Sequence, residues 1–182
     1  MLLVLGHKGF LLGSFLKEHN KPYISFDEYN NEQVEFGFFF AVPKFCSDKD
    51  ESIKMIDALR KLTGFIDVLN ANNAKLVFAS SEGVHDYDME DYIYLYAEEY
   101  IVRYCNRYLI LRIPTVISAN TFNESGYEFD YITLKSFCDT LSAIYESETG
   151  IFNFKTKHIR LCSSKVLISD PKKAPLFRGA WG

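Results

Sequence analysis

The sequence is poor in the features that mark disulfide-rich, nucleic-acid-binding or membrane proteins. Its 182 residues include four cysteines and no C-x-x-C pair, which argues against a zinc site or a disulfide framework and favours reduced core thiols. With 20 basic and 24 acidic residues the net charge is −4, so no nucleic-acid partner is expected. No apolar run is long enough for a membrane span or a signal sequence, and we expect a cytoplasmic protein without a membrane partner.

Hydrophobic residues make up 48% of the chain, which is enough for one domain with a sizeable core. Short apolar runs alternate with amphipathic segments, and this pattern predicts an α/β fold with a doubly wound parallel sheet and helices on both faces. The expected strands are 2–5, 23–26, 34–42, 75–79, 108–113 and 151–154, with one more at 165–168 as a possibility. The expected helices are 10–19, 52–70 and 91–107, and a fourth that opens at Tyr131 or Thr133 and ends near Gly150.

One connection does not fit this pattern. A parallel crossover usually needs about a dozen residues or more, but only residues 27–33 separate the second and third expected strands. Either the usual helix has been reduced to a loop, or the strand at 34–42 is misplaced.

The most informative segment is the first apolar run together with the glycines that follow it. Residues 2–5 are typical of a buried parallel strand. Gly6 permits a tight turn, Gly9 lets backbone N–H groups approach an anion, and the next helix offers its positive N-terminal end to a phosphate. The segment therefore predicts a dinucleotide-binding turn. Its expected cofactor-binding residues are Gly6, His7, Lys8, Gly9, Phe10 and Leu11.

Further binding residues are expected beyond the carboxyl ends of the strands, where open α/β sheets bind their ligands. Asp27 follows the glycines by about 20 residues, the spacing at which an acid accepts the ribose hydroxyls of an adenosine. Its charge disfavours a 2′-phosphate, so NAD is expected rather than NADP, although Lys8 could offset that repulsion. The alternative for Asp27 is an ordinary strand-terminating carboxylate. The other expected cofactor-binding residues are Ala41, Ser80 and Pro114, and no metal site is expected.

The chain resembles the extended short-chain dehydrogenase/reductase family in three segments. They are Gly6-x-x-Gly9-Phe10-Leu11, Leu76-Val77-Phe78-Ala79-Ser80-Ser81-Glu82-Gly83-Val84-His85 and Leu109-Ile110-Leu111-Arg112-Ile113-Pro114-Thr115-Val116. The likeness is to NAD-dependent nucleotide-sugar epimerases, dehydratases and dTDP-4-dehydrorhamnose reductases. It implies a NAD(P)-binding Rossmann-like domain over residues 1–155 and a short C-terminal extension over 156–182, with most of the family's substrate lobe absent.

The resemblance also implies catalytic residues. The family's catalytic serine or threonine matches Ser81, whose hydroxyl would bond to a substrate carbonyl; the alternative is a serine that caps a backbone group. The family's acid/base is a Tyr-x-x-x-Lys unit on the following helix, in which the lysine lowers the pKa of the tyrosine. If Tyr92 is that tyrosine, the lysine position holds Tyr96.

A second alignment leads to the same difficulty. If Ala97-Glu98-Glu99 matches the family's downstream acidic residues, the unit falls on Glu90 and Tyr94. Residues 82–102 contain no lysine, and a tyrosine without one has a pKa of about 10, which makes it a poor base at neutral pH. The family's third glycine is also displaced by one position, to Gly13.

Two functions follow from these observations. One is a reduced NAD-dependent oxidoreductase that acts on a nucleotide sugar through Ser81 and one of the tyrosines. The alternative is a catalytically inactive Rossmann-fold binding or scaffolding subunit. We also expect a homo-oligomer or a partner subunit, because the C-terminal segment Leu176-Phe177-Arg178-Gly179-Ala180-Trp181 has the residue types favoured at interfaces.

Overall fold

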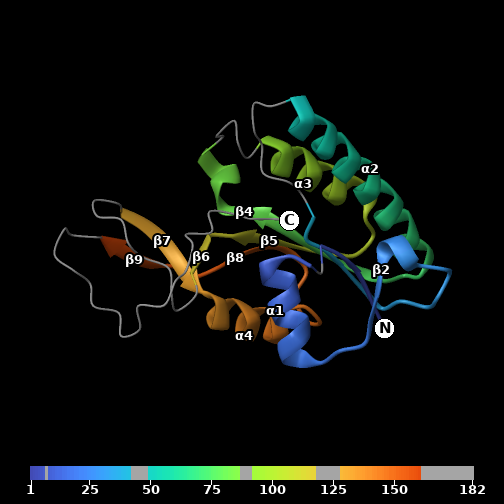
Figure 1. The fold of residues 1–182 in the computed structure, drawn as a ribbon, viewed down its shortest axis with the longest axis horizontal. Helices are drawn as coiled ribbons and strands as arrows, with labels where there is room; N and C mark the ends of the chain where they lie inside the picture. Colours follow the sequence, from blue (N-terminus) through green and yellow to red (C-terminus); the bar gives the residue numbers. More distant parts are fainter. Residues whose placement is uncertain (7, 42–48, 87–91, 118–127, 161–182) are drawn as a thin grey trace.

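A six-stranded parallel sheet forms the centre of the computed structural model, which describes residues 1–6, 8–41, 49–86, 92–117 and 128–160 (Figure 1). The strand order is β2-β1-β3-β4-β5-β8. The bounds of these strands are β1 Leu2–Leu5, β2 Tyr23–Ser25, β3 Phe36–Phe39, β4 Lys75–Ser81, β5 Tyr108–Ile113 and β8 Gly150–Asn153. The Rossmann-like parallel sheet predicted from the sequence is therefore confirmed, with β4 longer by two residues than expected.

The short connection after β2 is explained by the strand order. β2 and β3 lie on opposite sides of β1, about 10 Å apart across two strand spacings. The ten residues between Ser25 and Phe36 can reach about 33 Å when extended, so they return to the amino edge of the sheet without a crossover helix. Only a 3-10 turn, η1 (Phe26–Glu28), remains there. The first sequence alternative, a helix reduced to a loop, is correct.

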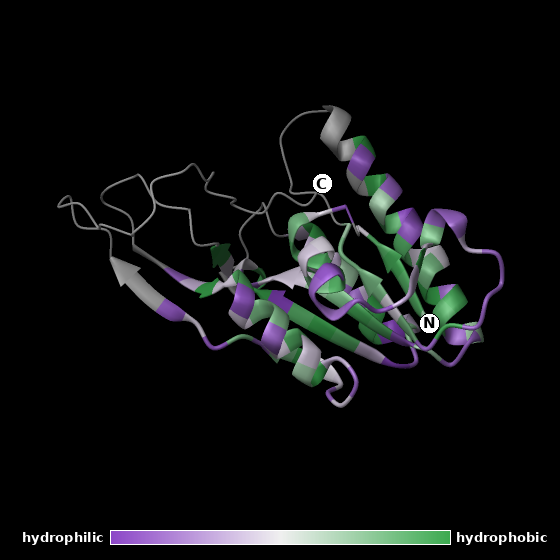
Figure 2. Ribbon diagram, turned by 60° about the horizontal axis from the view of Figure 1, so that its bottom comes forward, coloured by the Kyte–Doolittle hydropathy of each residue, from purple (hydrophilic) through white to green (hydrophobic). Residues whose placement is uncertain are grey.

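Two pairs of helices cover the two faces of the sheet. Helices α1 (Phe10–His19) and α4 (Leu134–Ile144) lie on one face, and α2 (Lys49–Ala71) and α3 (Tyr92–Tyr104) lie on the other (Figure 1). Hydrophobic residues are concentrated in the strands and on the inner sides of these helices (Figure 2). Each face has its own core, centred on Phe15, Phe38 and Phe137 beneath α1 and α4, and on Phe39 and Phe65 beneath α2. Among the described residues, no helix is apolar over a length that would cross a membrane.

A second, smaller sheet was not predicted from the sequence. It has the order β6-β7-β9, with β6 at Thr115–Ile117, β7 at Glu128–Thr133 and β9 at Lys157–Arg160. Of the two expected starts of the fourth helix, Thr133 is correct: it ends β7 and caps α4, because its Oγ1 accepts a hydrogen bond of 3.1 Å from the Ser136 N–H. The helix ends at Ile144, before the expected end near Gly150. The possible strand at 165–168 lies outside the described residues.

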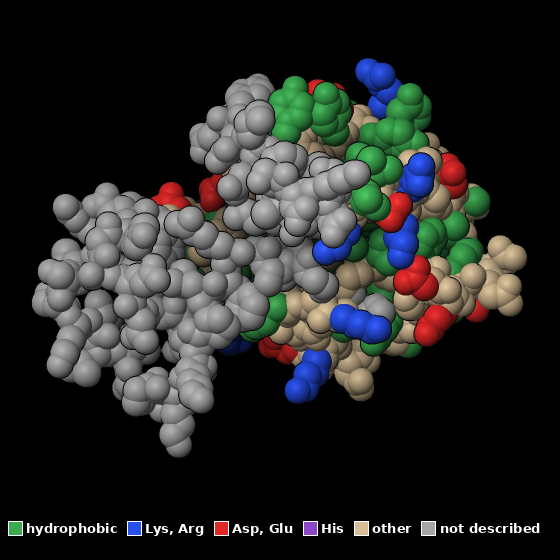
Figure 3. Space-filling view, turned by 45° about the horizontal axis from the view of Figure 1, so that its top comes forward, with side chains coloured by type: hydrophobic (Ala, Val, Ile, Leu, Met, Phe, Trp, Pro, Cys, Tyr) green, Lys and Arg blue, Asp and Glu red, His purple; other side chains and the backbone are tan. Residues whose placement is uncertain are grey.

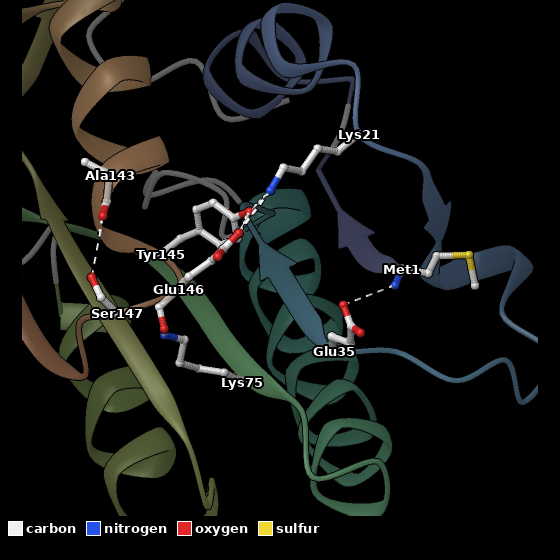
Figure 4. A network of polar contacts seen from close by, with 8 residues as sticks. All are labelled: Met1, Lys21, Glu35, Lys75, Ala143, Tyr145, Glu146 and Ser147. Carbon is white, nitrogen blue, oxygen red and sulfur yellow. Dashed lines mark hydrogen bonds and ion pairs between the residues drawn. The ribbon is translucent and has the colours of Figure 1, made fainter.

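The amino edge of the sheet is closed by a buried lysine (Figure 4). Lys75 is 1% exposed, and its Nζ donates to the backbone carbonyls of Glu146 and Glu148, at 2.7 and 3.0 Å. These carbonyls follow the C-terminus of α4, where a cation compensates unpaired acceptors. Beside them, the Tyr145 hydroxyl bonds to both Lys21 and Glu146. Burial, together with the charge of Arg107, lowers the pKa of Lys75.

Candidate functional site

The turn after β1 requires a glycine. Gly6 has φ +88°, and a Cβ placed on it would lie 2.4 Å from the carbonyl oxygen of Phe40. The turn closes with a hydrogen bond of 2.9 Å from the Gly9 N–H to the Gly6 carbonyl. The first intrahelical bond of α1 follows, from the Gly13 N–H to the Gly9 carbonyl. Position 6 therefore excludes every side chain, and the main chains of β1 and β3 approach closely there.

This turn lies at the switch point of the sheet. The chain leaves β1 toward α1 on one face and leaves β3 toward α2 on the other, so the ends of these neighbouring strands face a crevice. The amides at the start of α1 point to this edge, and Gly9 as N-cap has no side-chain oxygen to accept from them. The arrangement suits the pyrophosphate of a dinucleotide.

The expected cofactor-binding residues near the glycine turn differ in how far their side chains are exposed. Lys8 is exposed within the turn, and Ala41, two residues beyond the end of β3, is half-buried. Phe10 and Leu11 pack into the core beneath α1, so only their backbone groups are suited to bind a ligand. His7 lies outside the described residues.

Asp27 does not end a strand as expected but lies in the η1 turn after β2. Its Oδ1 accepts a hydrogen bond of 3.1 Å from Nζ of Lys61, which belongs to α2. Sequence analysis missed Lys61, because the residues are 34 positions apart and no local pattern links them. A lysine thus accompanies the carboxylate expected to bind the ribose.

The two serines at the end of β4 have different partners. Ser80 is fully buried, and its hydroxyl donates to Oε1 of Glu98 at 2.5 Å. Oγ of Ser81 accepts a hydrogen bond of 3.2 Å from the N–H of Gly83. Ser81 therefore caps a backbone group, the alternative noted from the sequence, but its hydroxyl proton is not used in this bond. Pro114, one residue beyond β5, is buried.

A buried ion pair, not anticipated from the sequence, holds α3 against the sheet. Arg112 of β5 contacts both carboxylate oxygens of Glu98, with Nη2 at 2.7 Å from Oε2 and Nε at 3.1 Å from Oε1. The side chains are 4% and 14% exposed for Glu98 and Arg112. Hydrogen bonding to Glu98 raises the pKa of Arg112. The sequence did carry a signal for this pair: Arg112 interrupts an apolar strand, and Glu98 lies on the apolar side of the helix that precedes this strand.

The tyrosines of α3 lie on different sides of the helix. Tyr94 is one turn before Glu98 and is buried, at 2% exposed. Tyr92 and Tyr96 lie on the outer side, at 48% and 56% exposed, with ring centroids 5.0 Å apart. A hydrogen bond with Tyr92 and the proximity of the two hydroxyls raise the pKa of Tyr96. This shift is opposite to the one that a Tyr-x-x-x-Lys unit produces.

No family model matches the sequence, and no curated protein matches it. Several solved structures do match. The capsular polysaccharide assembling protein CapF from Staphylococcus aureus aligns with a TM-score of 0.62 and 14% identity, over 87% of this chain and 55% of that one. A hypothetical dTDP-4-dehydrorhamnose reductase from Sulfolobus tokodaii aligns with a TM-score of 0.62 and 14% identity, over 87% and 77%. UDP-glucose 4-epimerase from Thermus thermophilus, in complex with NAD, aligns with a TM-score of 0.58 and 13% identity, over 86% and 79%.

These similarities show the fold. Two of the matching structures are a dTDP-4-dehydrorhamnose reductase and a UDP-glucose 4-epimerase, enzymes of the two kinds to which the sequence was likened. The present chain spans about half the length of CapF and about three quarters of the other two. The Rossmann-like architecture expected from the three sequence segments is therefore confirmed.

Proposed function

We propose that this protein is a NAD(P)-binding domain of the extended short-chain dehydrogenase/reductase family. The observation that supports this function best is the turn at Gly6, where a positive φ and the contact with Phe40 leave room for main chain only. The turn leads into a helix N-terminus at the switch point of a parallel sheet, the place where this architecture binds dinucleotides.

In this proposal different residues bind different parts of the cofactor. Backbone amides at the start of α1 hold the pyrophosphate, and Asp27 accepts from the adenosine ribose. Ala41 and Pro114, which follow the carboxyl ends of β3 and β5, border the rest of the dinucleotide. The bound nicotinamide supplies hydride-transfer chemistry. NAD is the dinucleotide that the Thermus thermophilus epimerase holds.

We further propose a nucleotide sugar as the substrate class, because epimerases and reductases with this fold act on such compounds. Ser81 is the residue suited to polarise a substrate carbonyl, since the Gly83 N–H orients its oxygen and its proton can be donated. Tyr92 and Tyr96 are the proposed proton donors on α3, where both are accessible to solvent.

Binding without catalysis is the second candidate function, and the tyrosines favour it. The raised pKa of Tyr96 keeps its hydroxyl protonated at neutral pH, so the phenolate that could act as a base is scarcer, and residues 82–102 contain no lysine to reverse the shift. In that case the domain acts as a regulatory or scaffolding subunit that retains nucleotide binding.

Calorimetric titration with NADH and NADPH tests the binding function. We expect the wild-type protein to bind at least one of them at millimolar concentration or below and Gly6→Ala to abolish binding. Gly150→Ala is the matched control, because Gly150 has the same φ of +88° with no atom near its Cβ position. Absence of binding to the folded wild-type protein would overturn the proposal.

Turnover distinguishes the two candidate functions. Oxidation of NADH in the presence of UDP- or dTDP-4-keto sugars should depend on Ser81 if the domain is an oxidoreductase. Ser147→Ala is the control for Ser81→Ala, because Ser147 follows α4 near the amino ends of the strands, away from the carboxyl ends where Ser81 lies (Figure 4). Binding of NADH without turnover would support the scaffolding function.

We also propose that the protein assembles as a homo-oligomer or with a partner subunit. Several large hydrophobic side chains are exposed on α2 and α3, the face that Figure 3 brings forward. They are Ile53, Ile56, Tyr92, Tyr96, Val102 and Tyr104. Light scattering after size-exclusion chromatography gives the mass in solution, and a monomer at micromolar concentration would contradict a homo-oligomer.

A further inference from the structure

The ion pair between Asp27 and Lys61 lies where the adenosine ribose is expected. Asp27 is two residues beyond Ser25, which ends β2 and pairs with Val4, so Asp27 follows the carboxyl end of the strand beside β1, as Gly6 follows that of β1. Both side chains are open to solvent, with 63% of Asp27 and 47% of Lys61 exposed. A ligand that approaches this edge can therefore contact both groups.

Lys61 reaches this edge because of its position along α2. The helix ends at Ala71, close to the amino edge where β4 begins. Lys61 is ten residues earlier, which corresponds to about 15 Å of helix. The distance along β1 from Leu2 to Gly6 is about 13 Å. The middle of α2 thus lies level with the glycine turn, even though the sequence distance from Asp27 is large.

Packing holds the two segments together. The ring of Phe26, which precedes Asp27, meets the ring of Phe65, one helical turn after Lys61, with centroids 5.1 Å apart. A Cβ on Gly64 would lie only 3.6 Å from the Phe26 ring. Because the η1 turn rests on α2 at this point, Lys61 is kept within reach of Asp27.

The net charge of Asp27 together with Lys61 differs from the charge of Asp27 alone, on which the sequence analysis based its preference for NAD. A lone carboxylate accepts from the 2′-hydroxyl of NAD and repels the 2′-phosphate of NADP, whereas a nearby cation accommodates the phosphate. An ammonium in contact with Asp27 compensates its charge and supplies a donor for phosphate oxygens.

We propose that Lys61 is a specificity-determining residue that makes this site accept a 2′-phosphorylated adenosine, so that NADP(H) binds at least as tightly as NAD(H). This inference rests on the proposed dinucleotide-binding function. It reverses the preference for NAD that Asp27 alone predicts.

The test compares two small probes that differ only in the 2′-phosphate, ADP and 2′-phospho-ADP, by calorimetric titration of the full chain. For the wild-type protein, 2′-phospho-ADP should bind as tightly as ADP or more tightly. In Lys61→Met the affinity for 2′-phospho-ADP should fall about tenfold relative to ADP, since one hydrogen bond between charged groups is lost. Lys54→Met, a change of an exposed lysine two turns away on α2, should leave the ratio of affinities unchanged.

Thermal unfolding of Lys61→Met first establishes that the variant is folded. If both probes bind and Lys61→Met leaves the ratio unchanged, or if the wild-type protein strongly prefers ADP, the role of Lys61 is refuted while dinucleotide binding stands. If the folded wild-type protein binds neither probe, and neither NADH nor NADPH, the proposed function itself fails.

Discussion

Removing the charge of Glu98 should destabilise this protein more than any comparable change of a surface carboxylate. In Glu98→Gln the side chain keeps its shape but no longer compensates the guanidinium of Arg112. The carboxylate is also the acceptor for the buried hydroxyl of Ser80. The substitution therefore weakens contacts between α3 and two neighbouring strands, β4 and β5, at the carboxyl edge of the sheet.

The expected magnitude follows from the burial of the pair. Removing one partner of a buried ion pair costs about 3–5 kcal/mol, because the remaining charge loses its compensation in a medium of low polarity. The glutamine amide can still accept from Ser80, so we expect about 3 kcal/mol, a large part of the roughly 5–15 kcal/mol that stabilises a typical domain. The exposed pair of Lys135 and Asp139 provides the control, since Asp139→Asn should cost at most about 0.5 kcal/mol.

Urea denaturation followed by far-ultraviolet circular dichroism measures both variants. A double-mutant cycle with Arg112→Met isolates the interaction: the combined variant should be more stable than the sum of the two single losses predicts. If Glu98→Gln loses less than about 1 kcal/mol, or if the cycle shows no coupling, the inference that this pair fixes α3 on the sheet is refuted.

Three further predictions concern other parts of the fold. Gly6→Ala should lose about 1–3 kcal/mol more than Gly150→Ala in urea denaturation, because both share the strain of a positive φ but only Gly6 also meets the Phe40 carbonyl; equal losses would contradict the steric argument. The pKa of Lys75 is lowered by burial, so between that lowered pKa and 10.5 the unfolded chain binds more protons than the folded protein. The free energy of unfolding should therefore rise with pH through this window, and the rise should be smaller in Lys75→Met. Burial and the charge of Glu18 raise the pKa of Cys138 to about 12. Mass-spectrometric mapping should therefore find Cys138 unlabelled by iodoacetamide at pH 8 in the folded protein and labelled in urea. Fast labelling of the folded protein would contradict this.

Local features of the sequence determined much of the fold. The bounds predicted for the strand at 2–5 and the helix at 10–19 agree with the structure, because the spacing of apolar residues that distinguishes a strand from a helix is visible within a few residues. The glycine turn between them was predicted for the same reason, since a positive φ at Gly6 is a property of one residue. Alternation of strands and helices then sufficed for a doubly wound parallel sheet.

The tertiary structure alone decided which distant residues meet. It placed β3 beside β1, which explains why the connection from β2 is a short loop in place of a crossover helix. It also brought Lys61 to Asp27 and set Glu98 against Arg112, which left Tyr92 and Tyr96 on the outer side of α3. These contacts depend on strand order and on the rotation of each helix against the sheet. Both are set by packing over the whole domain, and no single stretch of sequence carries that information.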